Sequence, residues 1–399
     1  MGRPRGLRRD GMMRILKIAT LVSRMKILMS ANAAWNIWNF RRPVLEALLL
    51  DGHDMTVLAP QDDAARRLAA RGCRIRHLEM SVKGLNPVLD LALLLRLRGE
   101  FREMRPDVIL SYTIKNNIYG ALAAKQVGIP FLPNVSGLGT AFLSGGLLEA
   151  VAVTLYKAAF RSLPVVFFQN EDDRDLFVDR GLVTRAQGRL IPGSGIDLDR
   201  FAAAPYPKAS EAPVFLMIAR LLRDKGILEY VEAARIVKST HPEARFQILG
   251  ATGTENRTAI DSDTVRQWER EGIIEYLGTS DDVRPLIGGA HCVVLPSYRE
   301  GAPRTLIEAA SMARPLIATD VAGCRSVIAN GETGILCGVK SGESLAAACE
   351  RFLHLDVEER KAMGRAGRRK MEREYDQRIV VEAYRRAIND VTSTRGMAA

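Results

Sequence analysis

The chain has 399 residues, 47% of them hydrophobic and 26% charged, which excludes a disordered or fibrous protein and gives enough length for two domains. The most apolar stretch, 143–160, is interrupted by Glu149 and Lys157, so we expect no membrane-spanning helix. The formal net charge is +11, and the five cysteines show no paired spacing, which predicts reduced thiols, no disulfide framework and no zinc site.

The positive charge is concentrated toward the amino terminus. Residues 1–200 hold 29 Lys and Arg against 19 Asp and Glu, whereas residues 201–399 hold 28 against 27, and residues 1–24 alone hold 7 against 1. This asymmetry fits either a solvated basic tail or an anionic partner, which would be a phosphate-bearing lipid surface or nucleic acid. Residues 1–24 lack a small-residue cleavage site, so we predict no signal peptide. They form a basic extension, either an over-extended start or a weakly amphipathic membrane contact.

Short apolar runs alternate with longer helical patterns over residues 25–205, which we assign to a first domain. The expected strands are 26–30, 55–59, 76–79, 108–112, 131–133, 165–169 and 190–192. The expected helices are 43–50, 62–71, 87–103, 117–127, 147–161 and 172–180. This alternation predicts an α/β fold, with a parallel sheet covered by helices on both faces.

One of these helical segments, 85–105, combines leucines with arginines. It carries Leu91, Leu93, Leu94 and Leu95, with Arg96, Arg98, Arg102 and Arg105 nearby. An apolar stripe beside cations suits a helix at a membrane surface. The same pattern also fits a helix that packs its apolar side on the core and exposes its basic side to solvent.

The pattern stops in an Ala- and Pro-rich linker at 194–213 and then resumes in a second domain, 206–375. Its expected strands are 214–218, 245–249, 274–277, 292–296, 316–318 and 334–337, and its expected helices are 226–238, 304–312, 342–352 and 357–372. The remaining residues, 376–399, are a tail whose helix, 376–390, has enough length to cross back onto the first domain. The two halves look like two copies of one architecture with a cleft between them, and such sheets bind ligands beyond the carboxyl ends of their strands.

The most informative segment is 296–320, where a short turn connects an apolar strand to a helix. Glu300 and Gly301 lie in the turn, and Pro303 opens the helix, where its missing N–H costs nothing. The free backbone N–H groups at this helix start would favour a diphosphate, and Gly301 would let the backbone approach it. Glu300 and Glu308 would accept hydrogen bonds from sugar and ribose hydroxyls. For either glutamate alone, a solvent-facing acid is the simpler interpretation.

Two cations follow the strand 214–218. Arg220 comes at its carboxyl end and Lys225 at the start of the next helix, where both would neutralise a diphosphate bound at the neighbouring helix start. No metal ion is then needed, and we assign no metal site to the Asp-x-Asp strings at 197–199 and 261–263. Two surface charges are the alternative interpretation.

These segments carry a resemblance to a known family. The chain resembles the retaining glycosyltransferases of family 4 in two segments, MIARLLRDKGI (217–227) and REGAPRTLIE (299–308) with its two glutamates. The resemblance extends over nearly all of residues 25–390. The segments SYTIKNNIYG (111–120), NVSGLGTAF (134–142) and DVAGCRSVI (320–328) are similar to the PglA-like branch of that family, which acts on undecaprenyl-diphosphate-linked saccharides. The resemblance implies the GT-B fold, in which two Rossmann-like domains face each other across a cleft and a C-terminal helix crosses back to the N-terminal domain.

The resemblance also implies roles for individual residues. Arg220, Lys225 and Glu300 would be the catalytic residues, because the two cations grip the diphosphate of the donor and Glu300 contacts its sugar. Glu308 would bind the ribose. The remaining residues of the donor site would be Gly301, Ala302, Pro303, Arg304, Thr305 and Leu306. On the acceptor side, in the N-terminal domain, the implied residues are Lys115, Asn116, Asn117, Gly137, Gly139 and Arg41.

The activity implied is transfer of a hexose or N-acetylhexosamine from a UDP-sugar to a saccharide acceptor, one linked to a lipid diphosphate, with retention of anomeric configuration. We expect no metal and no other cofactor, since the UDP-sugar is a substrate. The implied location is cytoplasmic and peripheral at the inner face of the membrane, with an anionic membrane surface as a further partner. A non-hydrolysing UDP-sugar epimerase of similar fold is the alternative, although such an enzyme would need more acidic residues and histidines facing the sugar than this sequence provides. We expect no nucleic-acid binding, because no aromatic-basic recognition motif is present.

The sequence departs from the family pattern at two places. The loop after the first strand, 30–40, lacks the paired glycines of many members and instead carries Trp35 and Trp38, followed by Arg41. These side chains would bind a saccharide or a lipid diphosphate, or the tryptophans would pack an ordinary helix. Many members also place a histidine near the end of the fourth strand, where this chain has Thr113 and Ile114.

Overall fold

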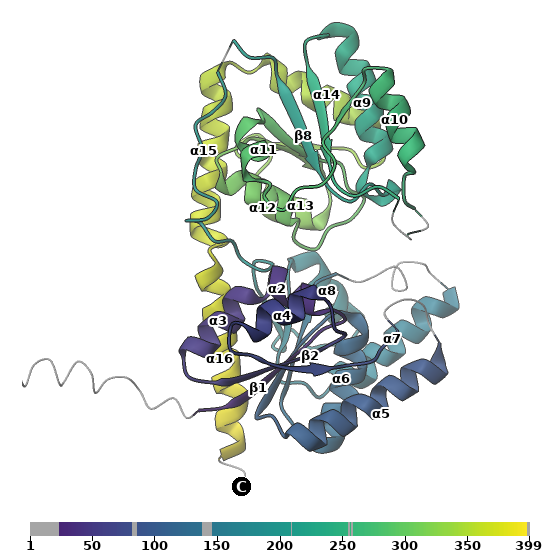
Figure 1. Ribbon diagram of the computed structural model, residues 1–399, viewed down its shortest axis with the longest axis vertical. Helices are drawn as coiled ribbons and strands as arrows, with labels where there is room; N and C mark the ends of the chain where they lie inside the picture. Colours follow the sequence, from purple (N-terminus) through teal and green to yellow (C-terminus); the bar gives the residue numbers. More distant parts are fainter. Residues whose placement is uncertain are drawn as a thin grey trace, which may run out of the picture.

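The computed structural model describes residues 24–81, 86–137, 146–208, 210–253, 256 and 258–396, and it consists of two α/β halves stacked end to end (Figure 1). The basic extension 1–23 therefore lies outside the described residues. Each half contains one parallel sheet with helices against it, as predicted.

The first sheet has seven parallel strands in the order β3-β2-β1-β4-β5-β6-β7. Its strands are β1 (Lys26–Ser30), β2 (Asp54–Ala59), β3 (Arg74–His77), β4 (Val108–Tyr112), β5 (Phe131–Val135), β6 (Val166–Phe168) and β7 (Gly188–Leu190). Its helices are α2 (Ala34–Phe40), α3 (Arg42–Leu50), α4 (Asp63–Ala69), α5 (Pro87–Met104), α6 (Ile114–Val127), α7 (Gly146–Phe160) and α8 (Glu171–Asp179). Ile27 and Met29 point into one hydrophobic core and Leu28 into the other, because successive side chains of a strand face opposite sides. Helices cover both faces of the sheet, so its strands are apolar almost throughout.

The second sheet repeats this topology with six parallel strands in the order β10-β9-β8-β11-β12-β13. Its strands are β8 (Val214–Ile218), β9 (Arg245–Leu249), β10 (Glu275–Tyr276), β11 (Cys292–Leu295), β12 (Leu316–Thr319) and β13 (Gly334–Cys337). Its helical segments are η2 (Arg223–Lys225), α9 (Ile227–Thr240), α10 (Ser262–Arg270), α11 (Arg284–Gly289), α12 (Arg304–Ser311), α13 (Ala322–Val327), α14 (Gly342–His354) and α15 (Val357–Glu374). In both sheets the strand order reverses beside the first strand, between β1 and β4 and between β8 and β11. Ligands of such sheets bind at this switch point, beyond the carboxyl ends of the strands.

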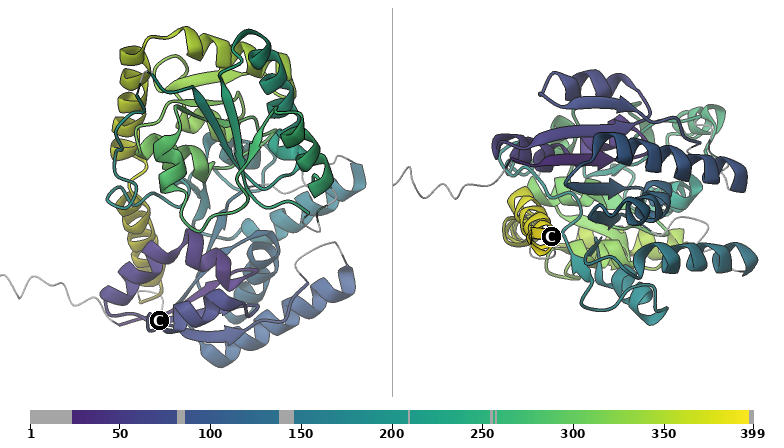
Figure 2. Two further views of the ribbon diagram at one scale, coloured as in Figure 1. Left: turned by 45° about the horizontal axis from the view of Figure 1, so that its top comes forward. Right: turned by 90° about the horizontal axis from the view of Figure 1, so that it is seen from below.

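The last helix, α16 (Gln377–Gly396), belongs to the first half although it follows α15, which packs on α12 of the second half. Val380, Tyr384 and Ile388 are buried in the core of the first half. The chain crosses where Gln377 N–H donates to the Ile196 carbonyl at 3.0 Å. Figure 2 shows α15 and α16 along one side of both halves, so the predicted cross-over is confirmed. Among the described residues, no helix combines the length and the apolar character needed to span a bilayer.

Several elements differ from the predicted ones. The helices α2, α10, α11 and α13 were not predicted, and α6 begins at Ile114 rather than at 117. Asp261, which precedes α10, accepts a hydrogen bond from Thr264 N at 2.8 Å and so caps that helix. Asp197 accepts from the N–H groups of Asp199 and Arg200 in a tight turn. Both Asp-x-Asp strings therefore contain an aspartate with a local backbone role.

Candidate active site

The donor side of the site is built where the loops after β8 and β11 meet. Tyr298 N–H donates to the Asp224 carbonyl at 2.9 Å, and Ser297 Oγ donates to the same carbonyl at 3.2 Å. Gly226 has a φ of 77°, and a Cβ at this position would overlap the Pro296 carbonyl. A glycine is therefore required where the two loops touch, and this contact brings Lys225 beside the loop that carries Glu300.

Lys225 and Glu300 form an ion pair, with 2.5 Å between Nζ and Oε1 and side-chain exposures of 24% and 13%. Arg220 follows the carboxyl end of β8 and is exposed, with no ion pair among the described residues. Thr305 Oγ1 donates to the Ile218 carbonyl at 3.1 Å, which fixes the first turn of α12 against the end of β8. The structure thus brings Arg220, Lys225 and Glu300 to one edge of the second sheet, beside the start of α12.

The start of α12 differs slightly from the predicted one. Pro303 is the N-cap residue and not the first helical residue, and Leu306 N–H donates back to its carbonyl at 3.1 Å. The first N–H groups of a helix have no carbonyl partner within it, so those of Arg304 and Thr305 remain available to an anion. The side chain of Leu306 is buried in the core of the second half.

Glu308 lies one turn into α12 and is 8% exposed. Its Oε1 accepts a hydrogen bond from Arg304 Nε at 2.7 Å. Burial raises the pKa of the Glu308 carboxyl above its usual value, although the charges of Arg304 and Arg200 act in the opposite direction. The carboxylate is therefore poorly solvated and ready to accept further hydrogen bonds from a ligand.

The residues just before α12 contact the first half of the molecule. Gly301 was expected to allow close approach of a ligand, but a Cβ there would lie 2.5 Å from the Ser136 carbonyl oxygen, so its small size is needed between the halves. A Cβ at Gly193 would likewise lie 2.8 Å from that of Ala302. Arg304 donates to the Asn39 carbonyl and stacks over the Phe40 ring at 5.4 Å.

On the opposite side, a pocket of about 330 Å³ opens at the switch point of the first sheet. Lys115 and Gly137 lie in its wall, and its other lining residues are Asn32, Met80, Thr113, Ile114 and Ser136. Lys115 Nζ is 2.8 Å from Asp90 Oδ1. The pocket meets the donor loop at Ser136, which lines the pocket and also contacts Gly301.

The other residues expected on the acceptor side have different positions. Asn116 and Asn117 lie within the first turn of α6, where they are buried. Asn116 Nδ2 donates to Ser30 Oγ at 2.9 Å, and Asn117 Nδ2 donates to the Asn134 carbonyl at 2.8 Å. They support the site from within the first half, because their side chains bond the ends of β1 and β5. Gly139 lies outside the described residues.

Arg41 is 4% exposed, with its guanidinium 4.8 Å from the centre of the Tyr112 ring. It donates to the Gly193 carbonyl at 3.1 Å and forms no salt bridge within the described part of the chain. Gly193 in turn packs against Ala302. Arg41 is thus attached to the segment that connects the two halves and is not part of the pocket wall around Lys115.

Thr113 has a φ of 74°, in the left-handed region that β-branched residues avoid. Its Oγ1 donates to Asn116 Oδ1 at 3.0 Å. Such backbone strain persists only where the surrounding structure imposes it, and it is concentrated at functional sites. Because Thr113 also lies in the pocket wall, the turn between β4 and α6 is a candidate functional segment.

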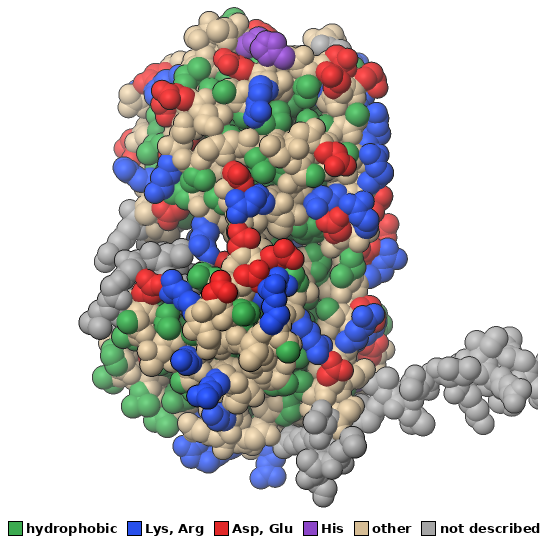
Figure 3. All heavy atoms as spheres, turned by 180° about the vertical axis from the view of Figure 1, so that it is seen from behind, with side chains coloured by type: hydrophobic (Ala, Val, Ile, Leu, Met, Phe, Trp, Pro, Cys, Tyr) green, Lys and Arg blue, Asp and Glu red, His purple; other side chains and the backbone are tan. Residues whose placement is uncertain are grey.

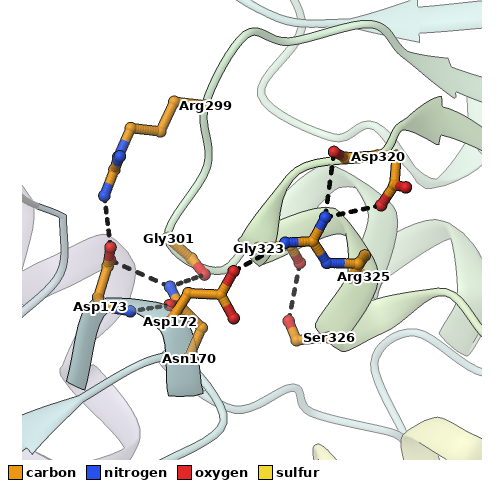
Figure 4. A network of polar contacts seen from close by, with 9 residues as sticks. All are labelled: Asn170, Asp172, Asp173, Arg299, Gly301, Asp320, Gly323, Arg325 and Ser326. Atoms are coloured by element: carbon orange, nitrogen blue, oxygen red, sulfur yellow. Dashed lines mark hydrogen bonds and ion pairs between the residues drawn. The ribbon is translucent and has the colours of Figure 1, made fainter. Parts of the chain in front are cut away.

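Sequence reasoning missed a polar network that joins the two halves beside Glu300 (Figure 4). Asn170 Nδ2 donates to the Gly301 carbonyl at 2.9 Å, and Arg299 pairs with Asp173 at 2.5 Å. Arg325 pairs with Asp172 at 2.7 Å. Figure 3 shows the wider context, in which side chains of both charges gather in a band where the two halves meet.

Comparison with known proteins agrees with this architecture. Residues 37–193 match the family described as "Glycosyl transferase 4-like domain", and residues 200–370 match "Glycosyl transferases group 1". The chain is 28% identical to the N,N'-diacetylbacillosaminyl-diphospho-undecaprenol alpha-1,3-N-acetylgalactosaminyltransferase of Campylobacter jejuni, over 90% of this chain and 97% of that protein.

Two further similarities extend this result. The chain is 23% identical to the UDP-Gal:alpha-D-GlcNAc-diphosphoundecaprenol alpha-1,3-galactosyltransferase of Escherichia coli, over 67% of this chain and 72% of that protein. The crystal structure of Anabaena HepE in complex with UDP has the same fold, with a TM-score of 0.74 and 15% identity over 92% of this chain and all of that one. The two family matches follow one another along the chain and agree with the fold and with these relatives. The chain is therefore a glycosyltransferase of the GT-B fold, in the group 1 and family 4 class.

Proposed function

We propose that the enzyme transfers a hexose or N-acetylhexosamine from a UDP-sugar to a saccharide carried on a lipid diphosphate. The observation that carries this proposal is the Lys225–Glu300 ion pair beside the start of α12, at the end of the sheet where Arg220 follows β8, with the pocket that contains Lys115 in the other half. The donor and acceptor classes are those in the names of the Campylobacter and Escherichia relatives. The UDP-bound Anabaena structure, which shares the fold, supports a nucleoside diphosphate as ligand.

In the proposed mechanism, Arg220, Lys225 and the free N–H groups of α12 hold the diphosphate. They stabilise the negative charge that develops on UDP as the bond to the sugar breaks. Glu308 accepts hydrogen bonds from the ribose, and Glu300 orients the donor sugar. The acceptor hydroxyl attacks from the same face that UDP leaves, and the departing phosphate takes its proton, so the configuration is retained without a nucleophilic side chain or a metal ion.

The direct test is a transfer assay with the purified enzyme. UDP-galactose, UDP-glucose and their N-acetyl forms are offered with undecaprenyl-diphosphate-linked monosaccharides, and the product is examined by mass spectrometry and by NMR. We expect one donor and acceptor pair to give an α-linked product, at the same rate in excess EDTA. Loss of activity in EDTA would contradict the metal-free mechanism, and a β-linked product would contradict retention.

We also propose that the enzyme docks on an anionic membrane surface through α5. Val88, Leu91 and Leu95 are 75%, 56% and 55% exposed, and their spacing places them on one face of the helix, which continues to the exposed Arg102. Leu93, expected in the same stripe, is instead buried in the core. In the view of Figure 3, hydrophobic side chains gather on the lower left of the first half, the side of α5 and α7. An exposed apolar face beside a cation suits the surface of a bilayer, from which a lipid-linked acceptor is taken.

Glutamine at Val88, Leu91 and Leu95 together is expected to lower binding to phosphatidylglycerol vesicles by about tenfold or more, because each buried aliphatic side chain contributes about 1.5–3 kcal/mol. The measurement is vesicle flotation at low and high salt. Leu50→Gln, at a position that is 88% exposed on another helix, is the control and should bind as wild type. Equal flotation of the triple variant and the wild type would rule out α5 as the docking surface.

A further inference from the structure

The loop that carries Glu300 is held on both sides by one helix end of the opposite half. Arg299, just before Glu300, pairs with Asp173 Oδ1 at 2.5 Å. The carbonyl of Gly301, just after it, accepts from Asn170 Nδ2 at 2.9 Å. Both partners lie at the start of α8, and Figure 4 shows them facing the loop. Glu300 therefore lies between two residues that are each anchored to the first half.

The start of α8 is itself buried and held by local hydrogen bonds. Asn170 Oδ1 accepts from Asp173 N–H at 2.8 Å, which caps the helix, and Asn170 Nδ2 also reaches Asp173 Oδ2 at 3.1 Å. The two residues are 4% and 1% exposed. Burial raises the pKa of Asp173, while Arg299 and Asn170 act against that rise. A buried carboxylate of this kind is costly when its partner is removed, so the contact with Arg299 is strongly favoured.

The loop has little room to move elsewhere. A Cβ at Gly323, in the first turn of α13, would lie 2.5 Å from the Glu300 carbonyl oxygen and 2.7 Å from that of Gly301. A Cβ at Gly301 would lie 2.5 Å from the Ser136 carbonyl oxygen of the first half. The backbone around Glu300 is thus confined between α13 and the first half, and its position depends on how the halves meet.

We propose that Asn170 and Asp173 are positioning residues for Glu300, which couple the apposition of the two halves to the placement of the donor sugar. This inference rests on the proposed role of Glu300. The diphosphate ligands Arg220, Lys225 and the start of α12 all belong to the second half, so they bind the nucleotide without help from α8. Loss of the α8 contacts therefore slows transfer and leaves nucleotide affinity unchanged.

The test compares Asp173→Asn and Asn170→Ser with Asp172→Asn. Serine keeps the helix cap but is too short to reach Gly301. Asp172→Asn removes an exposed ion pair between the same helix and Arg325, without touching the loop. We expect kcat to fall about tenfold or more in the first two variants, equal to about 1.4 kcal/mol, and to stay at the wild-type value in the third. The Kd of UDP, measured by calorimetry, should be that of the wild type in all three.

The variant Glu300→Gln separates the two levels of the proposal. Wild-type transfer by Glu300→Gln would refute the role of Glu300 itself. Impaired transfer by Glu300→Gln with normal transfer by Asp173→Asn would refute only the positioning role. If α8 acts through Glu300, adding Asp173→Asn to Glu300→Gln causes no further loss, and an additive loss would overturn the inference. Weaker UDP binding by Asp173→Asn would also overturn the inference. If Asp173→Asn does not fold, Arg299→Gln breaks the same contact from its more exposed partner.

Discussion

Replacement of Lys225 by methionine is expected to lower kcat about 100-fold to 1,000-fold, the cost of removing one preorganised group that stabilises charge in a transition state. Methionine has a similar length but no charge, and Lys225 is one of the two cations at the start of α12. In the proposed mechanism, its loss removes positive charge from the position where the departing UDP gains negative charge. The measurement is the steady-state rate with the donor and acceptor pair that the transfer assay identifies, together with the melting temperature.

Lys361→Met is the matched control for this substitution. Lys361 is also paired with a glutamate, Glu358, at 2.9 Å, but it lies on α15 and away from both switch points. The control variant should transfer sugar at the wild-type rate. If Lys225→Met did the same while remaining folded, the assignment of the donor diphosphate site would be wrong.

The second large effect is expected for Glu308→Gln, which should raise the KM for the UDP-sugar at least about tenfold. A hydrogen bond to a charged group contributes about 1.5–3 kcal/mol, and glutamine replaces the charged acceptor by a neutral one of the same shape. Arg304 can still donate to the glutamine oxygen, so the local structure should persist. Donor titrations at fixed acceptor concentration measure the effect. Glu372→Gln, which alters a partly exposed ion pair with Arg368 on α15, is the control.

The pH dependence of stability provides an independent check on Glu308. Burial raises the pKa of this carboxyl in the folded state, so the folded protein binds the proton more tightly than the unfolded chain does. The contribution to stability is therefore present below the unfolded pKa and is lost as the pH rises through the folded pKa. Glu308→Gln removes the group that ionises, so its melting temperature relative to wild type should be higher at pH 8 than at pH 4. A relative melting temperature that falls over this range would contradict the sign of the shift.

The sequence predicted the strands and the helix around the donor site well, because local patterns of apolar residues identify them without knowledge of long-range packing. Apolar runs located β8 and β13 to the residue, and the partly alternating pattern RFQIL located β9. The change from an apolar strand to a helical period located α12. The short helices α2 and α13, of seven and six residues, have no side-chain cap and too few turns to show a helical period. Sequence reasoning missed both for this reason.

The contacts between the halves could not be read from local patterns. Asp173 and Arg299 are 126 residues apart, and nothing in either segment identifies the other as its partner. The acidic run at 171–173 was visible, but local reasoning explains it as a helix start, where carboxylates are favoured. The sequence also predicted a need for glycine at 301, but for the approach of a ligand. In the structure the atom that leaves no room for a side chain at Gly301 is the Ser136 carbonyl oxygen of the other half.

The position of α16 has a consequence for biosynthesis. Its residues Val380, Tyr384 and Ile388 complete the core of the half that leaves the ribosome first. Domains ordinarily fold as units in the order of synthesis. This half is translated early but lacks one wall of its core until α16 has been made. The nascent protein therefore exposes the apolar surface of α3 and β4 until α16 packs there, so the first half is completed only after the second half has been translated.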